Sequence, residues 1–295
     1  MTRGHRIAEL LRQLIDEDVA ALAGRVDRAW SAGVEADPSA VVLGRYELVR
    51  VLGRGSYGVV FQGFDPILDR DVAIKVAHAR GSFDAVAHEA RMLARVRHPH
   101  VVAVYDAQRV GRYDLLVMQL VEGETMRRVA SRLDARELLE CYLQVAEGLA
   151  TAHRIGAVHG DVKPANILVD LERRAYLADF GQSRIVGFHE PASGCVKGTR
   201  AYLAPEALAG GPVTPLGDQY SLCVSVWESL FGCRPVPASG PSQSRLEALG
   251  DRHRRVARVL LRGLSPTPGD RFPDVLALGE ALRKSAGLGG ARWAS

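Results

Sequence analysis

The apolar pattern of the chain changes character near Gly123, and this change constrains the fold more than any other feature. Before it, five short runs rich in β-branched and aromatic residues are typical of strands, and one helical segment over 82–96 interrupts them. After it, apolar residues recur at steps of three and four, which predicts helices, with short strands only near 167–178. The expected strands cover 46–52, 59–64, 71–76, 101–107 and 115–121, and the expected helices cover 135–155, 218–232, 251–264 and 273–286. We therefore expect an α+β chain with a small β-rich lobe over 44–122, a larger and mostly helical lobe over 123–285, and a short tail over 286–295.

An amphipathic segment precedes these lobes. Apolar residues at helical spacing run through residues 5–31, and the Asp37-Pro38-Ser39 stretch ends the pattern, because proline disfavours a helical residue before it. We therefore expect a helical extension over residues 1–40. An apolar stripe of this length needs a cover, so residues 5–31 are expected either to pack on the small lobe or to mediate self-association or partner docking.

Composition excludes several classes of protein. With 47% hydrophobic and 24% charged residues, the 295-residue chain is close to the globular average, so a disordered, collagen-like or coiled-coil chain is disfavoured. No apolar run is long enough for a membrane span or a signal peptide, so we expect a cytoplasmic protein. The four cysteines form no CxxC pair, which argues against a zinc site or a disulfide framework. The net charge of +4 is not gathered into a basic surface with interleaved aromatic residues, so we expect no binding of nucleic acid.

Three glycines, Gly53, Gly55 and Gly58, form a GxGxxG pattern. A dinucleotide-binding fold would continue as a helix after the third glycine, whereas residues 59–61 continue as a strand. The pattern then predicts a β-hairpin whose tip lies over phosphates. An ordinary hairpin turn is the alternative.

Lysine is rare in this chain. Only four of the 38 basic residues are lysines, and one of them, Lys75, lies alone in the apolar run Val72-Ala73-Ile74. A buried ammonium needs an anion, and Glu89 on the following segment is a candidate partner. A lysine at a sheet edge and an incidental surface glutamate are the alternatives.

A second polar group follows in the larger lobe. The segment His159 to Asn166 contains Asp161, Lys163 and Asn166, which supply a carboxylate to orient a hydroxyl, a cation for a phosphate and an oxygen ligand for Mg²⁺. In isolation it would be an ordinary polar loop. That alternative loses weight because Asp179-Phe180-Gly181 and Ala204-Pro205-Glu206 follow in order.

These motifs together resemble the protein kinase family, of the bacterial serine/threonine type. The resemblance runs from about Tyr46 to Leu282 and implies the two-lobed kinase fold. It also implies a Mg-ATP-dependent enzyme, with Mn²⁺ as an alternative metal, that phosphorylates serine or threonine of protein substrates in signalling and can act on itself. The catalytic roles that it implies are phosphate contact by Lys75 held by Glu89, a base at Asp161, and neutralisation of the γ-phosphate by Lys163. Asn166 and Asp179 would bind the metal. The implied nucleotide-binding residues are Leu52, Gly53, Gly55, Gly58, Val60, Ala73, Lys75, Met118 as gatekeeper, Gln119 and Val121 in the hinge, and Leu168.

The resemblance also implies two structural anchors, one at Asp218 for the catalytic loop and one between Arg271 and Glu206. The sequence departs from the family at Gly160, where the family has an arginine that receives an activation-loop phosphate, so we expect activity that does not depend on phosphorylation of this loop. Aminoglycoside and choline kinases also have glycine here, which leaves a small-molecule kinase as an alternative. An ATP-binding pseudokinase scaffold and a nucleotide-sensing switch are further alternatives. The stretch over 232–254 is short for the family, so docking of substrates there could be reduced.

Overall fold

The computed structural model describes residues 19–31, 41–55, 58–78, 90–91, 93–180, 184–185, 200–235 and 250–289. The chain divides into two compact units. One unit comprises Met1–Ala94 and Ala103–Val121, and the other comprises Arg95–Val102 and Glu122–Ser295.

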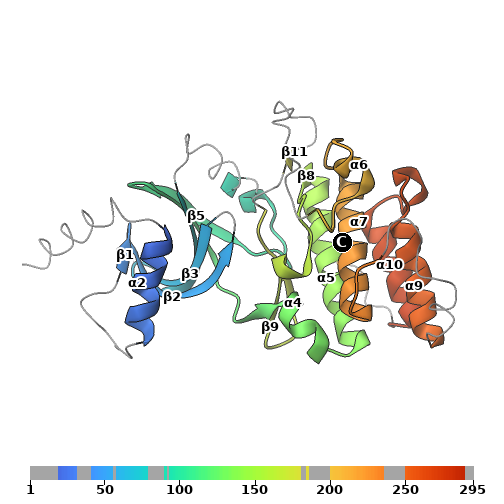
Figure 1. Ribbon diagram of the computed structural model, residues 1–295, viewed down its shortest axis with the longest axis horizontal. Helices are drawn as coiled ribbons and strands as arrows, with labels where there is room; N and C mark the ends of the chain where they lie inside the picture. Colours follow the sequence, from blue (N-terminus) through green and yellow to red (C-terminus); the bar gives the residue numbers. More distant parts are fainter. Residues whose placement is uncertain are drawn as a thin grey trace, which may run out of the picture. The chain divides into compact units, whose positions relative to one another are not determined.

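The first unit contains a six-stranded antiparallel sheet in the order β1-β2-β3-β4-β6-β5 (Figure 1). The strands are β1 Val41–Leu43, β2 Tyr46–Gly55, β3 Gly58–Asp65, β4 Arg70–His78, β5 Val104–Val110 and β6 Tyr113–Gln119. Four of the five strands expected from sequence therefore start at the predicted residue or at most two residues before it. The fifth, expected from residue 101, begins at Val104, and residue 101 instead makes an isolated bridge to Leu177.

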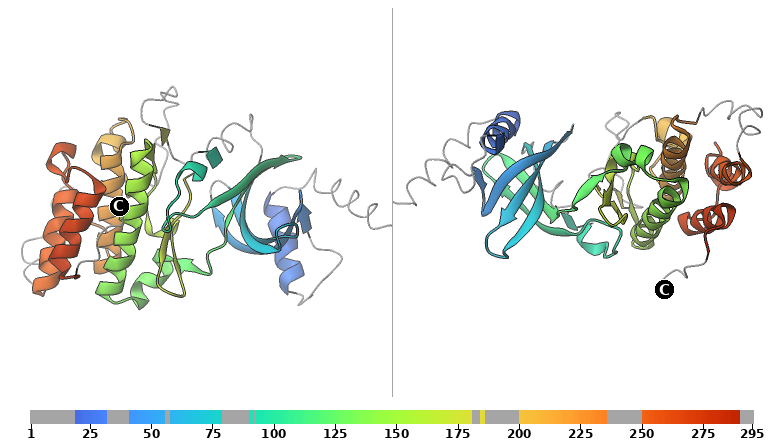
Figure 2. Two further views of the ribbon diagram at one scale, coloured as in Figure 1. Left: turned by 180° about the vertical axis from the view of Figure 1, so that it is seen from behind. Right: turned by 90° about the horizontal axis from the view of Figure 1, so that it is seen from below.

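The two faces of this sheet differ sharply. Alternate residues of β4, namely Val72, Ile74 and Val76, are fully buried on one face, because side chains along a strand point to opposite sides. Helix α2 (Val19–Ser31) covers that face, as Figures 1 and 2 show beside β2. Its buried residues Val19, Leu22, Ala23 and Val26 join one apolar cluster with those of β1 to β4 and β6. The helix is thus part of the core of the first unit.

The expectation for residues 5–31 is tested only in part. Residues 19–31 are helical and pack on the sheet of their own unit, whereas residues 5–18 lie outside the described residues. The helix expected over 82–96 is described only at 90–91 and 93–96, of which 90–91 and 93–95 are helical and residue 96 is not.

The second unit is mostly helical (Figures 1 and 2). Its main helices, α5 (Ala135–Arg154), α7 (Pro215–Phe231), α9 (Asp251–Gly263) and α10 (Val275–Ala286), confirm the four that the spacing predicts. Helix α5 packs on α7 and α10, and α9 packs on α7 and α10. The shorter elements are β7 (Gly123–Thr125), α4 (Met126–Val129), the 3-10 turns η1 (Ala130–Arg132), η2 (Pro164–Asn166) and η3 (Pro268–Asp270), β8 (Ala157–Val158), β9 (Ile167–Asp170), β10 (Ala175–Leu177), β11 (Arg184–Ile185) and α6 (Pro205–Leu208).

Capping residues fix where these helices begin and end. Asp134 and Glu137 form a reciprocal capping box that starts α5, so two N–H groups of its first turn have partners. Thr214 caps α7 and Pro215 occupies its first turn, while Gly232 in the left-handed conformation ends it. These signals lie in the sequence, which explains why the helix positions were predictable. The stretch over 232–254, which is short for the resembled family, is described only at 232–235 and 250–254. Among the helices that are described, none has the length and apolar character needed to cross a bilayer.

Candidate active site

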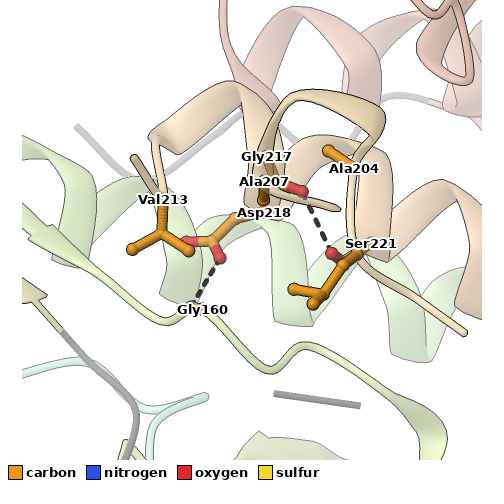
Figure 3. A pocket seen from close by; sticks show the side chains of 8 residues that line it. Gly160, Ala204, Ala207, Val213, Gly217, Asp218 and Ser221 are labelled. Atoms are coloured by element: carbon orange, nitrogen blue, oxygen red, sulfur yellow. Dashed lines mark hydrogen bonds between the residues drawn. The ribbon is translucent and has the colours of Figure 1, made fainter. Parts of the chain in front are cut away.

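The segment His159 to Asn166 lies between β8 and β9, and a single buried carboxylate anchors it. Asp218, in the first turn of α7, is 2% exposed and accepts hydrogen bonds from the backbone N–H groups of His159 and Gly160, both at 2.8 Å. Figure 3 shows the bond from Gly160. The ring Nε2 of His153, near the end of α5, donates to the same carboxylate at 2.8 Å. The anchor expected at Asp218 is therefore confirmed. His153 is a partner that the sequence did not indicate, because nothing in the pattern links it to a residue in another helix.

Gly160 has a φ of +76°. In this left-handed conformation the Cβ of any other residue would crowd the backbone, whereas glycine has no Cβ and adopts it without this steric strain. The glycine in place of the expected arginine is therefore suited to the backbone conformation that directs its N–H group at Asp218.

The carboxylate of Asp161 is held by two neighbours in the same segment. Lys163 Nζ lies 2.6 Å from Asp161 Oδ2, and the amide nitrogen of Asn166 donates to the Asp161 carbonyl at 2.9 Å and to Oδ2 at 3.2 Å. The η2 turn after Lys163 makes these contacts possible, since it folds Asn166 back over the start of the segment. The three polar residues predicted from sequence are thus brought together around one carboxylate.

The segment that carries Asp179 is tied to this loop from two sides. The N–H of Ala178 donates to the Asn166 carbonyl at 2.9 Å, and the Ala178 carbonyl accepts from His159 Nε2 at 3.1 Å. Because Nδ1 of His159 accepts from the Asp161 N–H, the proton of this imidazole is assigned to Nε2. The buried ring of Phe180 packs 4.5 Å from the His159 ring. Asp179, between these fixed points, has a φ of +63°, which aspartate tolerates better than most residues.

The oxygen atoms of this loop fit a magnesium ion that binds together with phosphates. Asn166 uses its amide nitrogen on Asp161, which leaves Oδ1 as the atom that can reach a cation, and Asp179 supplies a carboxylate. The described residues contain no group of three or more histidine, cysteine, aspartate or glutamate side chains suited to a metal. Mg²⁺ keeps several waters and commonly takes only one or two carboxylates with substrate phosphates, so this donor set suits it.

Most residues predicted to bind nucleotide in the first unit lie on the sheet face opposite α2. Val60 pairs with Lys75, Lys75 pairs with Leu116, and Ala73 pairs with Met118, and paired residues share a face. Ala73 and Lys75 alternate with the buried residues under α2, which places all of these side chains on the other side. Gly53 pairs with Val60 in the same row. The sheet register thus gathers residues that lie far apart in sequence.

The glycines of the hairpin differ in why they are needed. Gly58 has a φ of +135°, and a Cβ there would lie 2.1 Å from the Val76 carbonyl oxygen, so close packing of β3 on β4 already requires it. A Cβ on Gly53 would meet nothing within 4 Å, so packing of the described residues does not require glycine at that position. Gly55 pairs with Gly58 at the hairpin end, and the exposed Leu52 precedes Gly53.

The remaining predicted residues lie in several places. The Gln119 N–H donates to the Ala103 carbonyl at 2.8 Å, so this N–H is occupied, and Val121 is the last residue of the first unit. Leu168 lies in β9 of the second unit, opposite Thr125 of β7. Glu89 lies outside the described residues, so its pairing with Lys75 stays a prediction.

A second anchor lies beyond the site. Arg271 is buried and donates to both carboxylate oxygens of Glu206, at 2.8 and 2.7 Å, and to the carbonyls of Leu216 and Ser265. Burial is the largest single influence and tends to raise the pKa of Glu206, but the hydrogen bonds from Arg271, a backbone hydrogen bond and the charge of the guanidinium together lower this pKa below its ordinary value. The pairing expected from sequence is therefore confirmed.

Comparisons with known proteins agree on one family. A family model described as a protein kinase domain matches residues 46–270. The serine/threonine-protein kinase PknL of Mycobacterium bovis is 36% identical over 272 residues, which are 84% of this chain and 67% of that protein. The probable serine/threonine-protein kinase pknA2 of Bifidobacterium longum is 36% identical over 219 residues, 70% of this chain but only 29% of that protein. The crystal structure of the PknI kinase domain of Mycobacterium tuberculosis aligns with a TM-score of 0.67 at 30% identity, covering 85% of this chain and 100% of the other. The chain thus spans under a third of the B. longum relative and about two thirds of the M. bovis one.

Proposed function

Because the chain belongs to the protein kinase family, in its bacterial serine/threonine branch, we propose that it transfers the γ-phosphoryl group of ATP to serine and threonine hydroxyls of proteins. The observation that carries the proposal is the Asp161 carboxylate, which Lys163 and Asn166 hold within a loop that is anchored on Asp218. Members of this family use ATP and a divalent metal, and we propose Mg²⁺, with Mn²⁺ as the alternative.

The residues of the loop would act on the acceptor hydroxyl. Asp161 accepts a hydrogen bond from the hydroxyl, orients its oxygen toward the γ-phosphorus and takes its proton as the new O–P bond forms and the bond to the ADP oxygen breaks. Lys163, 2.6 Å from Asp161, can bring its positive charge to the transferring group, where negative charge needs compensation. The metal, held by Asn166 Oδ1 and Asp179, would supply further charge neutralisation at the phosphates.

The nucleotide would bind on the face of the first unit that α2 leaves open. Lys75 would contact the α- and β-phosphates, and the small and apolar side chains of Val60, Ala73 and Met118 beside it suit an adenine ring. Glu89 as the partner of Lys75 belongs to the same proposal. Gly53, which has no Cβ, would let the hairpin backbone approach the phosphates, and this role would account for a glycine that packing of the described residues does not require.

The alternatives are less favoured. A small-molecule kinase would share Gly160, but the relatives reported above are named serine/threonine-protein kinases. A scaffold or sensor without turnover would not need Lys75, Asp161 and Asp179 together, and all three are present. The cytoplasmic location, the lack of nucleic-acid binding and any partner bound through residues 5–31 stay predictions.

The proposal is tested by replacing Asp161 with asparagine. Asp161→Asn keeps the size of the side chain but removes its ability to accept the proton, so the rate of phosphate transfer to a generic protein substrate should fall by about 10²- to 10⁴-fold. Nucleotide affinity, measured by calorimetry, should be nearly unchanged. Asp251→Asn makes the same chemical change at an exposed position on α9 and serves as the control. Equal transfer rates for Asp161→Asn and the control would reject the proposal.

A further inference from the structure

A cluster of charged side chains lies in the second unit apart from the catalytic loop residues. The buried Tyr202 donates its hydroxyl hydrogen to Glu228 Oε2 at 2.5 Å, and Arg127 Nη2 donates to the same hydroxyl at 3.2 Å. Arg234 Nε lies 3.9 Å from the other oxygen of Glu228. We call these four residues the Tyr202 cluster. Burial, together with Glu228, raises the pKa of Tyr202 to about 12, so the phenol remains protonated at neutral pH.

The Tyr202 cluster has an excess of positive charge at its exposed rim. It contains one carboxylate and two guanidinium groups, and both arginines are exposed, whereas Tyr202 is buried. One oxygen of Glu228 already accepts the tyrosine hydrogen bond and the other faces Arg234. An incoming cationic side chain would therefore meet two guanidinium groups, whereas a carboxylate would find donors on two sides.

Three elements place this cluster beside the catalytic loop. Arg127 belongs to α4, which packs against the η2 turn Pro164–Asn166. Glu228 lies one turn after Ser225 on α7, and the Ser225 hydroxyl lies 3.5 Å from the Val162 carbonyl. Leu203, the neighbour of Tyr202, lines a small cavity together with Gly160 and Asp218, and Figure 3 labels the latter two. Helices α4 and α7, which carry Arg127 and Glu228, therefore contact the loop that carries Asp161, the segment of Tyr202 shares a cavity with that loop, and Arg234 joins the cluster through Glu228.

We propose that Arg127 and Arg234 bind a carboxylate side chain of the protein substrate near its acceptor hydroxyl, so that acidic sequences are preferred. The inference rests on the proposed kinase function and names the substrate class that this site would select. If instead the two arginines moved aside and exposed Glu228, the same cluster would select a basic side chain. The sign of the charge preference therefore decides between the two possibilities.

The experiment measures kcat and KM on serine peptides that differ only by glutamate, glutamine or lysine at each position flanking the acceptor. Activity on a generic protein is measured first, because it reports the kinase function separately. Glutamate should give the lowest KM at one position at least. Arg127→Gln and Arg234→Gln should each reduce the glutamate advantage about threefold, equivalent to about 0.7 kcal/mol at about 1.4 kcal/mol per tenfold, with kcat and the KM for ATP little changed.

The controls separate charge recognition from folding. Arg128→Gln removes the same charge from the next residue of α4, which is also exposed, and should leave the preference intact. Glu228→Gln should shift the preference the other way, toward a larger glutamate advantage, because it removes the negative charge of the cluster. High salt should weaken the preference, since the screening length falls from about 10 Å at 0.1 M to about 3 Å at 1 M salt.

Three results would overturn the inference. One is a lower KM for lysine peptides, and another is an unchanged glutamate advantage in both arginine variants. Either result rejects only the substrate preference, because activity of the wild-type protein on the generic substrate still supports the proposed kinase function. The third is a wild-type protein that transfers phosphate to no protein or peptide, which overturns the proposed function and this inference together.

Discussion

Replacing Asp218 with asparagine should lower both the free energy of unfolding and the rate of phosphate transfer. The carboxylate accepts three hydrogen bonds of 2.8 Å, with Oδ2 serving His159 and His153 and Oδ1 serving Gly160. In asparagine, one oxygen becomes an NH₂ group that cannot accept a hydrogen. If this group replaces Oδ1, it faces the Gly160 N–H and leaves that buried donor without a partner. If it replaces Oδ2, the His159 N–H loses its partner instead.

The magnitude follows from the bonds that are lost. Hydrogen bonds to charged groups contribute about 1.5 to 3 kcal/mol each, and the remaining bonds lose their ionic character, so the free energy of unfolding should fall by about 2 to 4 kcal/mol. The catalytic loop would also shift, and a misplacement of about 1 Å at a reacting group can cost about 10²-fold in rate. His153→Leu removes only the ring donor and keeps both backbone bonds, so its effects should be smaller.

Two assays check this prediction. Chemical denaturation gives the free energy of unfolding, and transfer of phosphate to a generic protein at saturating ATP gives kcat. Asp251→Asn, at an exposed position, is the matched control. An Asp218→Asn protein that matches this control in both assays would refute the reasoning that the carboxylate holds the loop.

Three further predictions concern other parts of the chain. Leu22→Ala should destabilise the first unit by about 2 to 5 kcal/mol in denaturation, since Leu22 is fully buried under the sheet, whereas Leu171→Ala at a side chain that is 83% exposed should change little. Phosphatase treatment should leave the kinase activity on a protein substrate unchanged, because Gly160 has no side chain that could bind a loop phosphate. Gly160→Arg should lower the melting temperature, because a non-glycine residue at a φ of +76° costs about 1 to 2 kcal/mol. The Glu206 carboxyl has a pKa in the folded protein below its ordinary value of 4.5, so the unfolded chain binds more protons in acid than the folded protein does. The free energy of unfolding should therefore fall as the pH drops below about 4.5, and it should fall less in Glu206→Gln.

The main helices and strands were predictable because local signals specify them. Asp134 and Glu137 mark the start of α5 and Gly232 marks the end of α7, and both ends agree with the prediction, whereas α7 begins at Pro215, three residues before the predicted start, although Thr214 caps it there. The short strands β1, β7, β8 and β11 were missed. Each has only two or three residues, so no periodicity can build up within it, and β7, β8 and β11 also form through pairing with a distant segment.

The contacts that join distant segments were predictable only where a family pattern supplied them. Asp218 lies 58 residues from Gly160, and nothing in the spacing indicates that they meet. His153 and the Tyr202 cluster were not found, because tyrosine, glutamate and arginine are ordinary residues for a helix surface. Their meeting depends on how α4, α7 and the segment before α6 pack, which periodicity does not encode.

The glycine at position 160 changes how the catalytic loop can be kept in place. Its left-handed φ turns the N–H of Gly160 toward Asp218 Oδ1 while the preceding N–H of His159 reaches Oδ2, so two consecutive donors meet one carboxylate. An arginine in the same conformation would add strain of about 1 to 2 kcal/mol to the loop, and binding of a phosphate would have to offset it. Glycine removes both the strain and the phosphate receptor. We therefore predict that independence from loop phosphorylation has two causes, a loop backbone that glycine holds without strain and the missing arginine side chain, and Gly160→Ala separates them. If strain matters, Gly160→Ala lowers both stability and activity although alanine, like glycine, cannot bind a phosphate.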